Sequence, residues 1–475
     1  MTHLSSRPMK LILGIAVLAL AVRITAGVMV GWDRLLPVAD QPLYDAFAKN
    51  ILEGKGFQIP DIIRKTPKGL LLNKDFEKMG YFGVVLPDRS TAFFPPVYPI
   101  MMTASYWLFG PHPGSARLVQ SFFDALACFL VGWMGVRLFG LRHGVVAGLI
   151  YALYPAFIGL TTVLWTIGMG VFTLVLALAL TVYFQQKPTM WAAMWMGMGW
   201  GLAALTRSAL LPFLLVVLVL AWWHTRTALK TEKESRDSNI KSGIRPRHQW
   251  LYPLIIAIGM MVLLTPWGIR NAVVMGHFTL TPTKGGRNLW EANNGIFSEP
   301  YIKYSATAGG MAQVYHRYVQ SRLEGLQRTD LIEFPEFSVD MSEFERDKIL
   351  KRQVIDFLKA NPRVATELCF LRFYSLIRVV LGGWSSYWFA KIAGIISMGF
   401  VLIGGLIGLV INCKRWNCLS LFYLLVIYYV AVHMATAAGI PHRLPLDAVL
   451  ILFATSALFW GYECVLRPSL SQKIC

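Results

Sequence analysis

The chain has 475 residues, of which 55% are hydrophobic and 15% are charged, and its mean hydropathy is +0.51. This composition excludes a water-soluble globular protein and indicates a polytopic membrane protein. The formal net charge of +19 suits nucleic acid, anionic lipid or asymmetric cytoplasmic loops. The six cysteines lack the spacing of a metal site, so we expect them to be buried apolar residues.

Apolar runs divide the chain into predicted spans. The first run, residues 11–31, is interrupted only by Arg23 and can cross a core of roughly 30 Å. No A-x-A site follows it, so we interpret it as a span rather than a signal peptide. The chain is therefore predicted to be an all-α membrane protein with about ten transmembrane helices. The other nine runs are 116–136, 144–163, 166–184, 190–206, 208–224, 250–269, 388–412, 418–437 and 443–464.

Basic residues give the predicted orientation. The linker at 224–249 carries seven lysines and arginines against three acidic residues, and short basic loops stay in the cytoplasm. Ten spans place this linker on the same side as both termini and three basic turns, at Arg137 and Arg142, at Lys187, and at Lys414 and Arg415. Both termini are thus expected to be cytoplasmic. The linker lacks aromatics, which favours contact with anionic membrane lipid over nucleic acid.

Two further apolar stretches are not counted as spans. Residues 93–110 begin with three prolines and are expected to form a re-entrant or interfacial helix. Residues 364–383 hold three charges, each costing about 2.5–3.5 kcal/mol at mid-membrane, so this stretch is expected along the outer surface. The predicted organisation is one transmembrane domain, 1–465, with a first outer loop at 32–115, the basic linker at 224–249, a late outer loop at 270–387 and a cytoplasmic tail at 466–475.

The first outer loop opens with a short amphipathic helix that has an acidic residue at its start. Asp40 precedes an apolar stripe made by Tyr44, Ala48 and Ile51, and Gly54 ends the helix. A carboxylate at a membrane surface can act as a base or as an oxygen ligand for a divalent cation. Composition alone makes it as reasonable that Asp40 only caps the helix.

The late outer loop contains a second polar segment. Lys284 and Arg287 bracket a glycine pair, whose backbone N–H groups can approach an anionic or sugar ligand. The following Asn288 and Trp290 are residue types that hydrogen-bond to and stack on sugars. These features favour a substrate loop over a plain turn. Farther on, an apolar stripe at 344, 349, 354 and 357 predicts an amphipathic helix that ends at Pro362.

Several short motifs occur along the chain in an order that is similar to that of a known family. Taken together they resemble the integral-membrane glycosyltransferases of the GT-C type, and they are similar to bacterial protein O-mannosyltransferases and to the aminoarabinose transferase that modifies lipid A. The resemblance covers nearly the whole chain. The motifs are Asp40 and Tyr44 followed by AxxILxGxGF, then FPPxYP at 94–99, RLFGxR at 137–142, GLAALTR at 201–207, PWxxRN at 266–271, GGxNLWxxNN at 285–294 and RLPLD at 443–447.

The resemblance implies transfer of a sugar from a polyprenyl phosphate carrier to an envelope lipid, glycan or protein on the outer face of a bacterial inner membrane. It places the catalytic acidic residue at Asp40, which could also bind a divalent metal. Relatives often pair two acids here, whereas this chain continues with Gln41, and Asp45 is a weaker candidate five residues along the helix. A second departure is at Thr166, where many relatives carry an acid; both departures bear on any metal site.

The leaving lipid phosphate needs cations at the membrane surface. Arg207, Arg270 and Arg443 fall at predicted outer ends of spans, and Arg443 is the first choice because its family counterpart lies at the same end of a late span. His442 could share the phosphate. The alternatives are interfacial snorkelling for the arginines and simple packing for the histidine. The complete predicted substrate-binding set is Tyr44, Arg207, Arg270, Lys284, Arg287, Asn288, His442 and Arg443.

Some features leave alternatives open. Asp124 and His433 lie inside apolar runs without an evident partner, and helix packing is their simpler explanation. A transporter or flippase of lipid-linked sugars would show paired halves with broken helices, and no such repeat is apparent. A polymerase of lipid-linked sugars would depend on arginines in one late outer loop without the early aspartate. The enlarged outer loops favour the glycosyltransferase.

Overall fold

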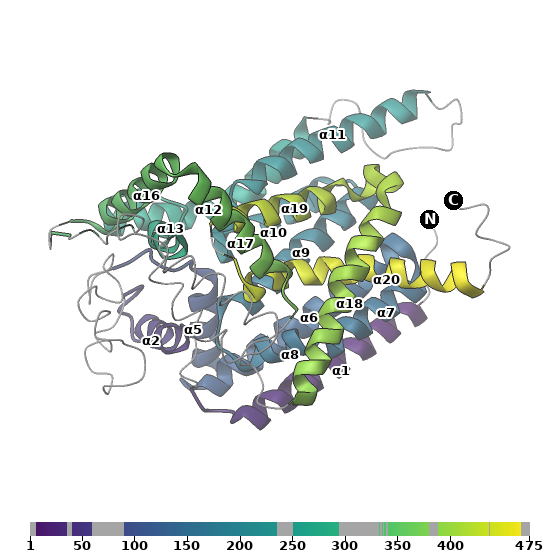
Figure 1. Ribbon diagram of the computed structural model, residues 1–475, viewed down its shortest axis with the longest axis horizontal. Helices are drawn as coiled ribbons and strands as arrows, with labels where there is room; N and C mark the ends of the chain where they lie inside the picture. The colour runs from purple at the N-terminus through teal and green to yellow at the C-terminus, as the bar shows by residue number, and fades with distance from the viewer. Residues whose placement is uncertain are drawn as a thin grey trace.

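The computed structural model describes residues 6–35, 40–58, 90–234, 250–293, 332, 335, 337–338, 341–379, 388–436 and 438–466. Over these residues the chain is helical and contains no β-strand, only one isolated bridge between Gln58 and Ser90 (Figure 1). The all-α fold class is therefore confirmed. The helices are α1 (Ser6–Val30), α2 (Gln41–Leu52), α5 (Val97–Phe109), α6 (Pro113–Phe139), α7 (Leu141–Leu153), α8 (Pro155–Thr162), α9 (Thr166–Gln186), α10 (Met190–Thr206), η1 (Ser208–Leu210), α11 (Phe213–Glu234), α12 (Leu251–Met275), α13 (Gly285–Asn293), α16 (Glu343–Ala360), α17 (Pro362–Ile377), α18 (Trp388–Ile411), η4 (Cys413–Arg415), α19 (Trp416–Ala435) and α20 (Ile440–Leu466).

Each of the ten predicted apolar runs contains a helix of the described chain. Seven helices of the described chain, α1, α6, α9, α12, α18, α19 and α20, are long and apolar enough to cross a membrane, and α7 with α8 forms an eighth span if the pair, bent by 47°, is counted as one. Helix α10 has 17 residues, and the apolar part of α11 covers only Phe213–Thr227. These two lie below the usual length of about 20 residues. The structure thus supports seven or eight spans, and the count of ten stays a prediction.

The bend between α7 and α8 has a local cause. Pro155 starts α8, and Tyr154 before it is extended, so the helical ladder is interrupted inside the apolar layer. The Arg23 guanidinium donates to the backbone carbonyls of Tyr151, at 3.1 Å, and Ala152 at this interruption. The Asp124 carboxylate pairs with Arg23 and accepts the Tyr151 hydroxyl at 2.8 Å. Asp124 therefore has the partner that the sequence did not reveal.

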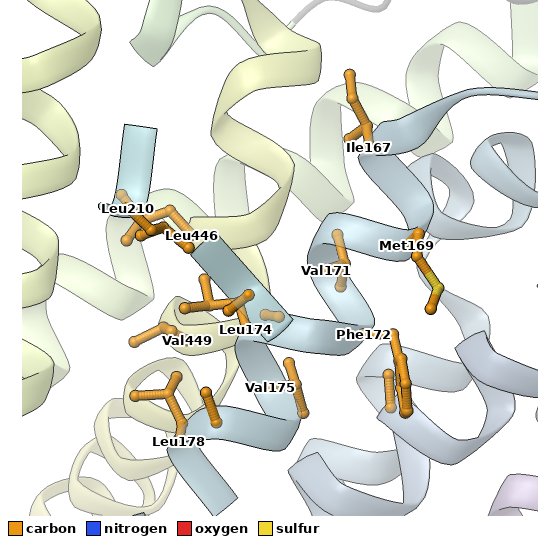
Figure 2. Packing of buried hydrophobic residues seen from close by; sticks show 14 of the residues in the cluster. Ile167, Met169, Val171, Phe172, Leu174, Val175, Leu178, Leu210, Leu446 and Val449 are labelled. Carbon is orange, nitrogen blue, oxygen red and sulfur yellow. The ribbon is translucent and has the colours of Figure 1, made fainter. Parts of the chain in front are cut away.

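Helix α9 lies at the centre of the bundle. It is apolar on all sides, which is typical of a helix surrounded by protein, and it packs against α6, α10 and α20. Figure 2 shows Leu174 of α9 beside Val449 of α20, with Leu178 nearby, whereas Met169 and Phe172 point to the other side of α9. Of an apolar stretch of 18 residues in each helix, 78% is buried in α9 and 72% in α20, against 33% in α1 and α18. The latter two helices lie at the edge of the bundle.

Glycines allow the closest helix contacts. A Cβ on Gly197 of α10 would lie 2.1 Å from the Ile256 carbonyl oxygen of α12, and one on Gly408 of α18 would lie 1.9 Å from the Phe453 oxygen of α20. Small residues at such crossings let helix backbones approach in the absence of a hydrophobic driving force. The cysteines differ from the expectation: Cys128 is buried, but Cys413 and Cys418 are exposed because they flank the η4 turn.

The basic turns share one end of the bundle. The Arg415 guanidinium donates to the Leu138 carbonyl at 2.7 Å, which places the η4 turn beside the turn after α6. The Tyr252 hydroxyl donates to the Pro188 carbonyl at 2.9 Å, so the α9–α10 turn lies beside the start of α12. In Figure 1 the start of α1, the end of α11 and the end of α20 lie at this same end. That it faces the cytoplasm stays a prediction from the positive-inside tendency.

The opposite end carries the shorter helices α2, α5, α13, α16 and α17 (Figure 1). Helix α5, with 13 residues, is about 20 Å long and too short to cross a membrane, and α17 has 16 residues. Neither is among the candidate spans of the described chain. The amphipathic helix predicted before Pro362 is α16, which ends at Ala360, and the proline starts α17.

Candidate functional site

Asp40 lies at the N-cap position of α2, but its side chain makes no capping hydrogen bond. Its Oδ2 atom instead accepts a hydrogen bond from Lys284 Nζ at 3.1 Å, a contact between residues 244 positions apart. The two side chains are 22% and 23% exposed. The alternative that Asp40 only caps the helix is therefore wrong, because the carboxylate faces the late outer loop.

Lys284 is held in place by aromatic faces and by its neighbours in the chain. Its ammonium lies 4.8 Å from the ring centre of Phe94 and 5.5 Å from that of Phe93, both within the range of cation–π attraction. The preceding Thr283 donates its backbone N–H to the Ala92 carbonyl at 3.1 Å. The segment before α13 is thus docked on residues 91–94, which lead into the FPPxYP motif of the predicted first outer loop.

Glu343 anchors the same segment from α16. Its Oε1 accepts hydrogen bonds from the Thr91 hydroxyl at 2.9 Å and from the Thr283 hydroxyl. Burial raises the pKa of the Glu343 carboxyl to about 7, while its hydrogen bonds and the charge of Arg270 act in the opposite direction. One buried carboxyl group therefore joins the two outer loops beside Lys284.

The glycine pair after Lys284 has a packing role. The Gly286 N–H donates to Asp347 Oδ1 of α16 at 2.5 Å, and a Cβ at Gly286 would lie 2.3 Å from the Asp347 carbonyl oxygen. The anion that this N–H contacts is thus a side chain of the protein rather than a ligand. The segment also differs from the predicted loop, because it forms helix α13.

Helix α13 carries Arg287 and Trp290 on its buried face. Trp290 is only 2% exposed, Arg287 is buried, and Asn288 is exposed. Arg372 of α17 donates to the Ala292 carbonyl at 2.9 Å and to the Met434 carbonyl at 3.0 Å. It therefore ties the ends of α13 and α19 together. Trp290 does not offer a free face for stacking on a sugar in this structure.

Tyr44 lies one helical turn after Asp40 and is almost fully buried. Its ring centre is 4.7 Å from that of Phe94 and 4.8 Å from that of Tyr98. Burial raises the pKa of the Tyr44 phenol well above its ordinary value, the Asp40 charge raises it further, and the charge of Arg207 opposes both. Tyr44 thus lies in the electrostatic neighbourhood of both charged residues.

Arg207 is brought there by the end of α10. It is the C-cap residue of α10, and its side chain crosses α9 at Gly170, where a Cβ would lie 2.6 Å from Arg207 Cδ. Its Nε atom is buried and has no hydrogen-bond partner among the described residues. Around it lie Tyr429 and His433 of α19, with rings 4.6 Å apart, and His442 of α20, 5.2 Å from His433.

We refer to Arg207, Tyr429, His433 and His442 as the cationic cluster. Within the described part of the chain, His442 Nδ1 is buried without a hydrogen-bond partner, and Tyr429 lies against the Arg207 side chain. The electrostatic neighbours of His442 are His433, Arg207 and Lys284. The charge of Lys284 is thus felt at His442 as well as at Asp40. Polar atoms buried without partners are rare and call for a ligand or another explanation.

Asp45 and Arg270 are engaged by the protein. The Asp45 carboxylate accepts the Tyr106 hydroxyl at 2.6 Å and the Lys49 ammonium at 2.9 Å, so both oxygens are occupied. The Arg270 guanidinium donates to the Thr91 carbonyl at 2.9 Å and lies 5.2–5.3 Å from two aromatic ring centres. Both residues hold the first outer loop in place, and their predicted roles in chemistry stay predictions.

Arg443, the first sequence choice for the phosphate, is only 3% exposed. Its guanidinium pairs with Asp447 at 2.9 Å and donates to the carbonyls of Leu376 and Arg378, each at 2.8 Å. The Tyr154 hydroxyl donates to the other oxygen of Asp447 at 2.8 Å. Arg443 thus fastens the end of α17 to α20. Its phosphate-binding role remains a prediction from the resemblance.

The sequence did not assign Tyr429 and His433 to the site. A signal was present, because the two residues are four positions apart and such a spacing places side chains on one helix face. Gln41 and Thr166, the positions that depart from the family pattern, also lie near one another. Gln41 Oε1 accepts a hydrogen bond of 3.0 Å from the backbone N–H of Leu164, which is two residues before Thr166. The Thr166 hydroxyl is buried and has no partner within the described residues.

A metal at Asp40 does not fit the described residues. No group of three or more His, Cys, Asp or Glu side chains within the described ranges could hold a metal ion. The contact of Asp40 is an ammonium, and Asp45 is engaged elsewhere. A divalent cation needs several oxygen ligands. Gln41 and Thr166, the two positions that depart from the family pattern, do not supply a second carboxylate. We therefore derive no metal-dependent step.

The arrangement of helices has the fold of the GT-C type membrane glycosyltransferases, as solved structures show. The archaeal oligosaccharyltransferase AglB from Archaeoglobus fulgidus, in complex with an inhibitory peptide and a dolichol-phosphate, aligns with a TM-score of 0.51 and 12% identity over 97% of this chain and 52% of its own. The same enzyme tethered with an acceptor peptide aligns with a TM-score of 0.52 and 12% identity over 95% of this chain and 50% of its own.

A third structure, ArnT from Cupriavidus metallidurans bound to undecaprenyl phosphate, aligns with a TM-score of 0.39 and 12% identity over 97% of this chain and 80% of its own. That score is too low to support a shared fold by itself. The chain spans about half the length of the oligosaccharyltransferase. No protein-family model and no curated protein matches the sequence. At these identities the comparisons establish the fold alone, and they confirm the predicted GT-C type architecture.

Proposed function

We propose that this protein is a membrane glycosyltransferase that moves a sugar from a polyprenyl phosphate carrier to an acceptor in the bacterial cell envelope, at the outer face of the inner membrane. The observation that carries the proposal is the pairing of Asp40 with Lys284 beside the cationic cluster. A carboxylate for the acceptor and cations for the carrier phosphate then lie together at one end of the bundle, on the fold of known glycosyltransferases.

Asp40 is the proposed base. As the acceptor oxygen attacks the anomeric carbon, its proton passes to the Asp40 carboxylate and a new carbon–oxygen bond forms. The bond between the anomeric carbon and the phosphate oxygen breaks, and its electron pair stays on that oxygen. The products are the glycosylated acceptor and the free polyprenyl phosphate, so atoms and charges balance without another reactant.

Arg207, Lys284 and His442 are the proposed contacts of the carrier phosphate. Negative charge grows on that phosphate as the bond breaks, and the Arg207 and Lys284 cations, already held in place, stabilise it without reorganisation, while His442 offers a ring nitrogen. Arg207 suits this role because its buried Nε atom lacks a partner in the described part of the protein. Arg270 and Arg443 are assigned instead to holding the outer segments, because backbone carbonyls and Asp447 already occupy their guanidinium groups.

The comparisons support the carrier class but leave the sugar and the acceptor open. The archaeal oligosaccharyltransferase is described with a dolichol-phosphate, which is a polyprenyl-type phosphate. The remaining predicted contacts, Tyr44, Arg287 and Asn288, lie close to Lys284 in the chain or beside Asp40. Asn288 is the exposed one of the three and is proposed to face the sugar or the acceptor.

The test uses purified protein in lipid nanodiscs with a panel of polyprenyl phosphate sugars and an extract of envelope acceptors, and it measures release of polyprenyl phosphate. Asp40→Asn is expected to lower the rate by about 10²- to 10⁴-fold, the usual contribution of a general base. Glu53→Gln is the matched control, because Glu53 is the exposed C-cap residue of the same helix. Full activity of Asp40→Asn would refute the assignment. No release from any donor by folded protein would favour a transporter of lipid-linked sugars.

A further inference from the structure

We propose that Lys284 is a latch between Asp40 and the carrier phosphate. In the structure its ammonium holds the Asp40 carboxylate. When the donor enters, its phosphate draws the ammonium toward the cationic cluster and frees the carboxylate for the acceptor hydroxyl. The inference rests on the proposed function and deepens it, since it makes donor binding the event that prepares the base.

The position of Lys284 allows this exchange. Its Nζ atom is 3.1 Å from Asp40 Oδ2, and Lys284 is also an electrostatic neighbour of His442 in the cluster. Its ammonium lies over the faces of Phe94 and Phe93, which attract a cation without fixing the direction of a hydrogen bond. A lysine ammonium on a flexible four-carbon stem can change partners while its backbone stays in place.

The backbone that carries Lys284 is firmly held. Thr283 is hydrogen-bonded to the Ala92 carbonyl and to Glu343, and Gly286 is hydrogen-bonded to Asp347. Because both flanks of Lys284 are anchored, the exchange requires only rotation of its side chain. The movement is therefore local and does not depend on opening of the outer loops.

The cationic cluster supplies the alternative destination. Arg207 Nε and His442 Nδ1 are buried without hydrogen-bond partners in the described chain, and Tyr429, which is only 1% exposed, lies against the Arg207 side chain. An arginine and an imidazole with free hydrogen-bonding atoms, beside a phenol, form a site for an anion with several oxygens, such as a phosphate ester. Asp40 balances only one of the two positive charges of Lys284 and Arg207, so an anion is favoured electrostatically.

The exchange also has a consequence for the order of events. While Lys284 is bound to Oδ2, the Asp40 carboxylate is partly occupied and its charge is paired. The phosphate gains negative charge as its bond to the sugar breaks, so the attraction for Lys284 is greatest in the transition state. The latch then stabilises the leaving group at the moment when Asp40 accepts the proton.

A double-mutant cycle of binding tests the latch without requiring turnover. Calorimetry measures the affinity of decaprenyl phosphate for the full-length protein in nanodiscs, with decaprenol as the probe that lacks the phosphate. The variants are Asp40→Asn, Lys284→Met and the double variant. We expect Asp40→Asn to tighten phosphate binding by about 5- to 10-fold, because Lys284 is no longer held, and Lys284→Met to weaken it by at least about 10-fold. In the Lys284→Met background, Asp40→Asn should change the affinity by less than about twofold.

Two results would overturn the latch. Equal tightening by Asp40→Asn in both backgrounds would mean that Asp40 simply repels the phosphate through space. No tightening in either background would mean that Lys284 does not leave Asp40. Lys351→Met is the matched control, because Lys351 forms the same kind of pair with Asp347 at 2.5 Å on the other side of α13. Its phosphate affinity should equal that of the unmodified protein.

The failure of the latch is distinguishable from that of the proposed function. Release of polyprenyl phosphate that depends on Asp40, with no coupling in the cycle, would retain the glycosyltransferase and remove the latch. Coupling without release from any donor would retain the phosphate site and remove the proposed reaction. If Lys284→Met lowers the midpoint of thermal unfolding, Lys284→Gln, which keeps a hydrogen-bond donor, replaces it in the cycle. A decaprenol affinity that changes with the phosphate affinity would show a loss of lipid binding and overturn the latch.

Discussion

Replacing Glu343 by glutamine removes a charge from the contact between the two outer loops but keeps an oxygen that can accept hydrogen bonds from Thr91 and Thr283. Burial, the main cause, raises the Glu343 pKa from an ordinary 4.5 to about 7 in the docked structure. The docked state therefore binds the proton more tightly than an opened state in which the carboxyl is in water. Docking is strongest below the ordinary pKa and weakens as the pH rises toward and through 7.

The size of the effect follows from these two pKa values. Between pH 6 and pH 8, a carboxyl with a pKa of 4.5 stays ionised in the opened state, whereas one with a pKa of about 7 loses most of its proton in the docked state. The docked state then loses about 1.3 kcal/mol, which is close to a tenfold change in the opening equilibrium. This is an upper value, because solvent that reaches the carboxyl screens the effect.

Hydrogen exchange of the amides at 281–293 measures this opening directly. After correction for the intrinsic pH dependence of exchange, protection in the unmodified protein should fall by up to about tenfold from pH 6 to pH 8. Protection in Glu343→Gln should stay constant, and Glu53→Gln, which changes an exposed carboxyl outside this contact, should behave as the unmodified protein. An equal pH dependence with and without Glu343 would refute the assignment, since Asp347 would then be the titrating group.

Two further substitutions test the packing. Asp124→Asn leaves Arg23 charged and unpaired in the apolar layer, so we expect the free energy of unfolding to fall by about 3–5 kcal/mol. The measurement is the midpoint of thermal unfolding, and an unchanged midpoint would contradict a buried ion pair. Gly286→Ala places a Cβ 2.3 Å from a backbone carbonyl of α16 and should cost about 1–3 kcal/mol, seen as lower amide protection in α13. Gly285→Ala is its control, because a Cβ there meets only the end of a lysine side chain at 3.1 Å, and equal loss in both variants would refute the close approach.

The spans and the Asp40 helix could be predicted because their signals are local. Apolar runs and an i, i+4, i+7 stripe depend only on neighbours in the chain, and the structure places α2 with Asp40 at its N-cap as expected. The apolar lengths of α10 and α11 are below the usual length of a span of about 20 residues, so these two spans stay predictions. The glycine pair at 285–286 predicted a loop, whereas the structure has helix α13 there. Its loop character is a weak local preference, and the burial of Trp290 in α13 overrides it.

The site itself depends on contacts that no local pattern contains. The pair of Asp40 with Lys284 joins positions 244 apart, and Glu343 joins both outer loops only after they fold together. Arg443 is different, because its partner Asp447 is four residues away in the same RLPLD motif and the spacing alone predicts an ion pair on a helix. The resemblance assigned Arg443 to the phosphate, whereas the local physics already offered it a structural partner.

The distinction between binding and structural cations at this end of the protein can be made from their partners. Arg270 and Arg443 have backbone carbonyls or a carboxylate opposite their guanidinium groups, so releasing them to a ligand would leave those acceptors unsatisfied. Arg207 keeps a buried donor without a partner in the described residues. The Lys284 ammonium is hydrogen-bonded to Asp40, which the proposed reaction would itself neutralise. A phosphate can recruit Arg207 and Lys284 without breaking the contacts that position the outer helices. We therefore assign Arg270 and Arg443 to the structure of the site, and Arg207 and Lys284 to binding of the phosphate.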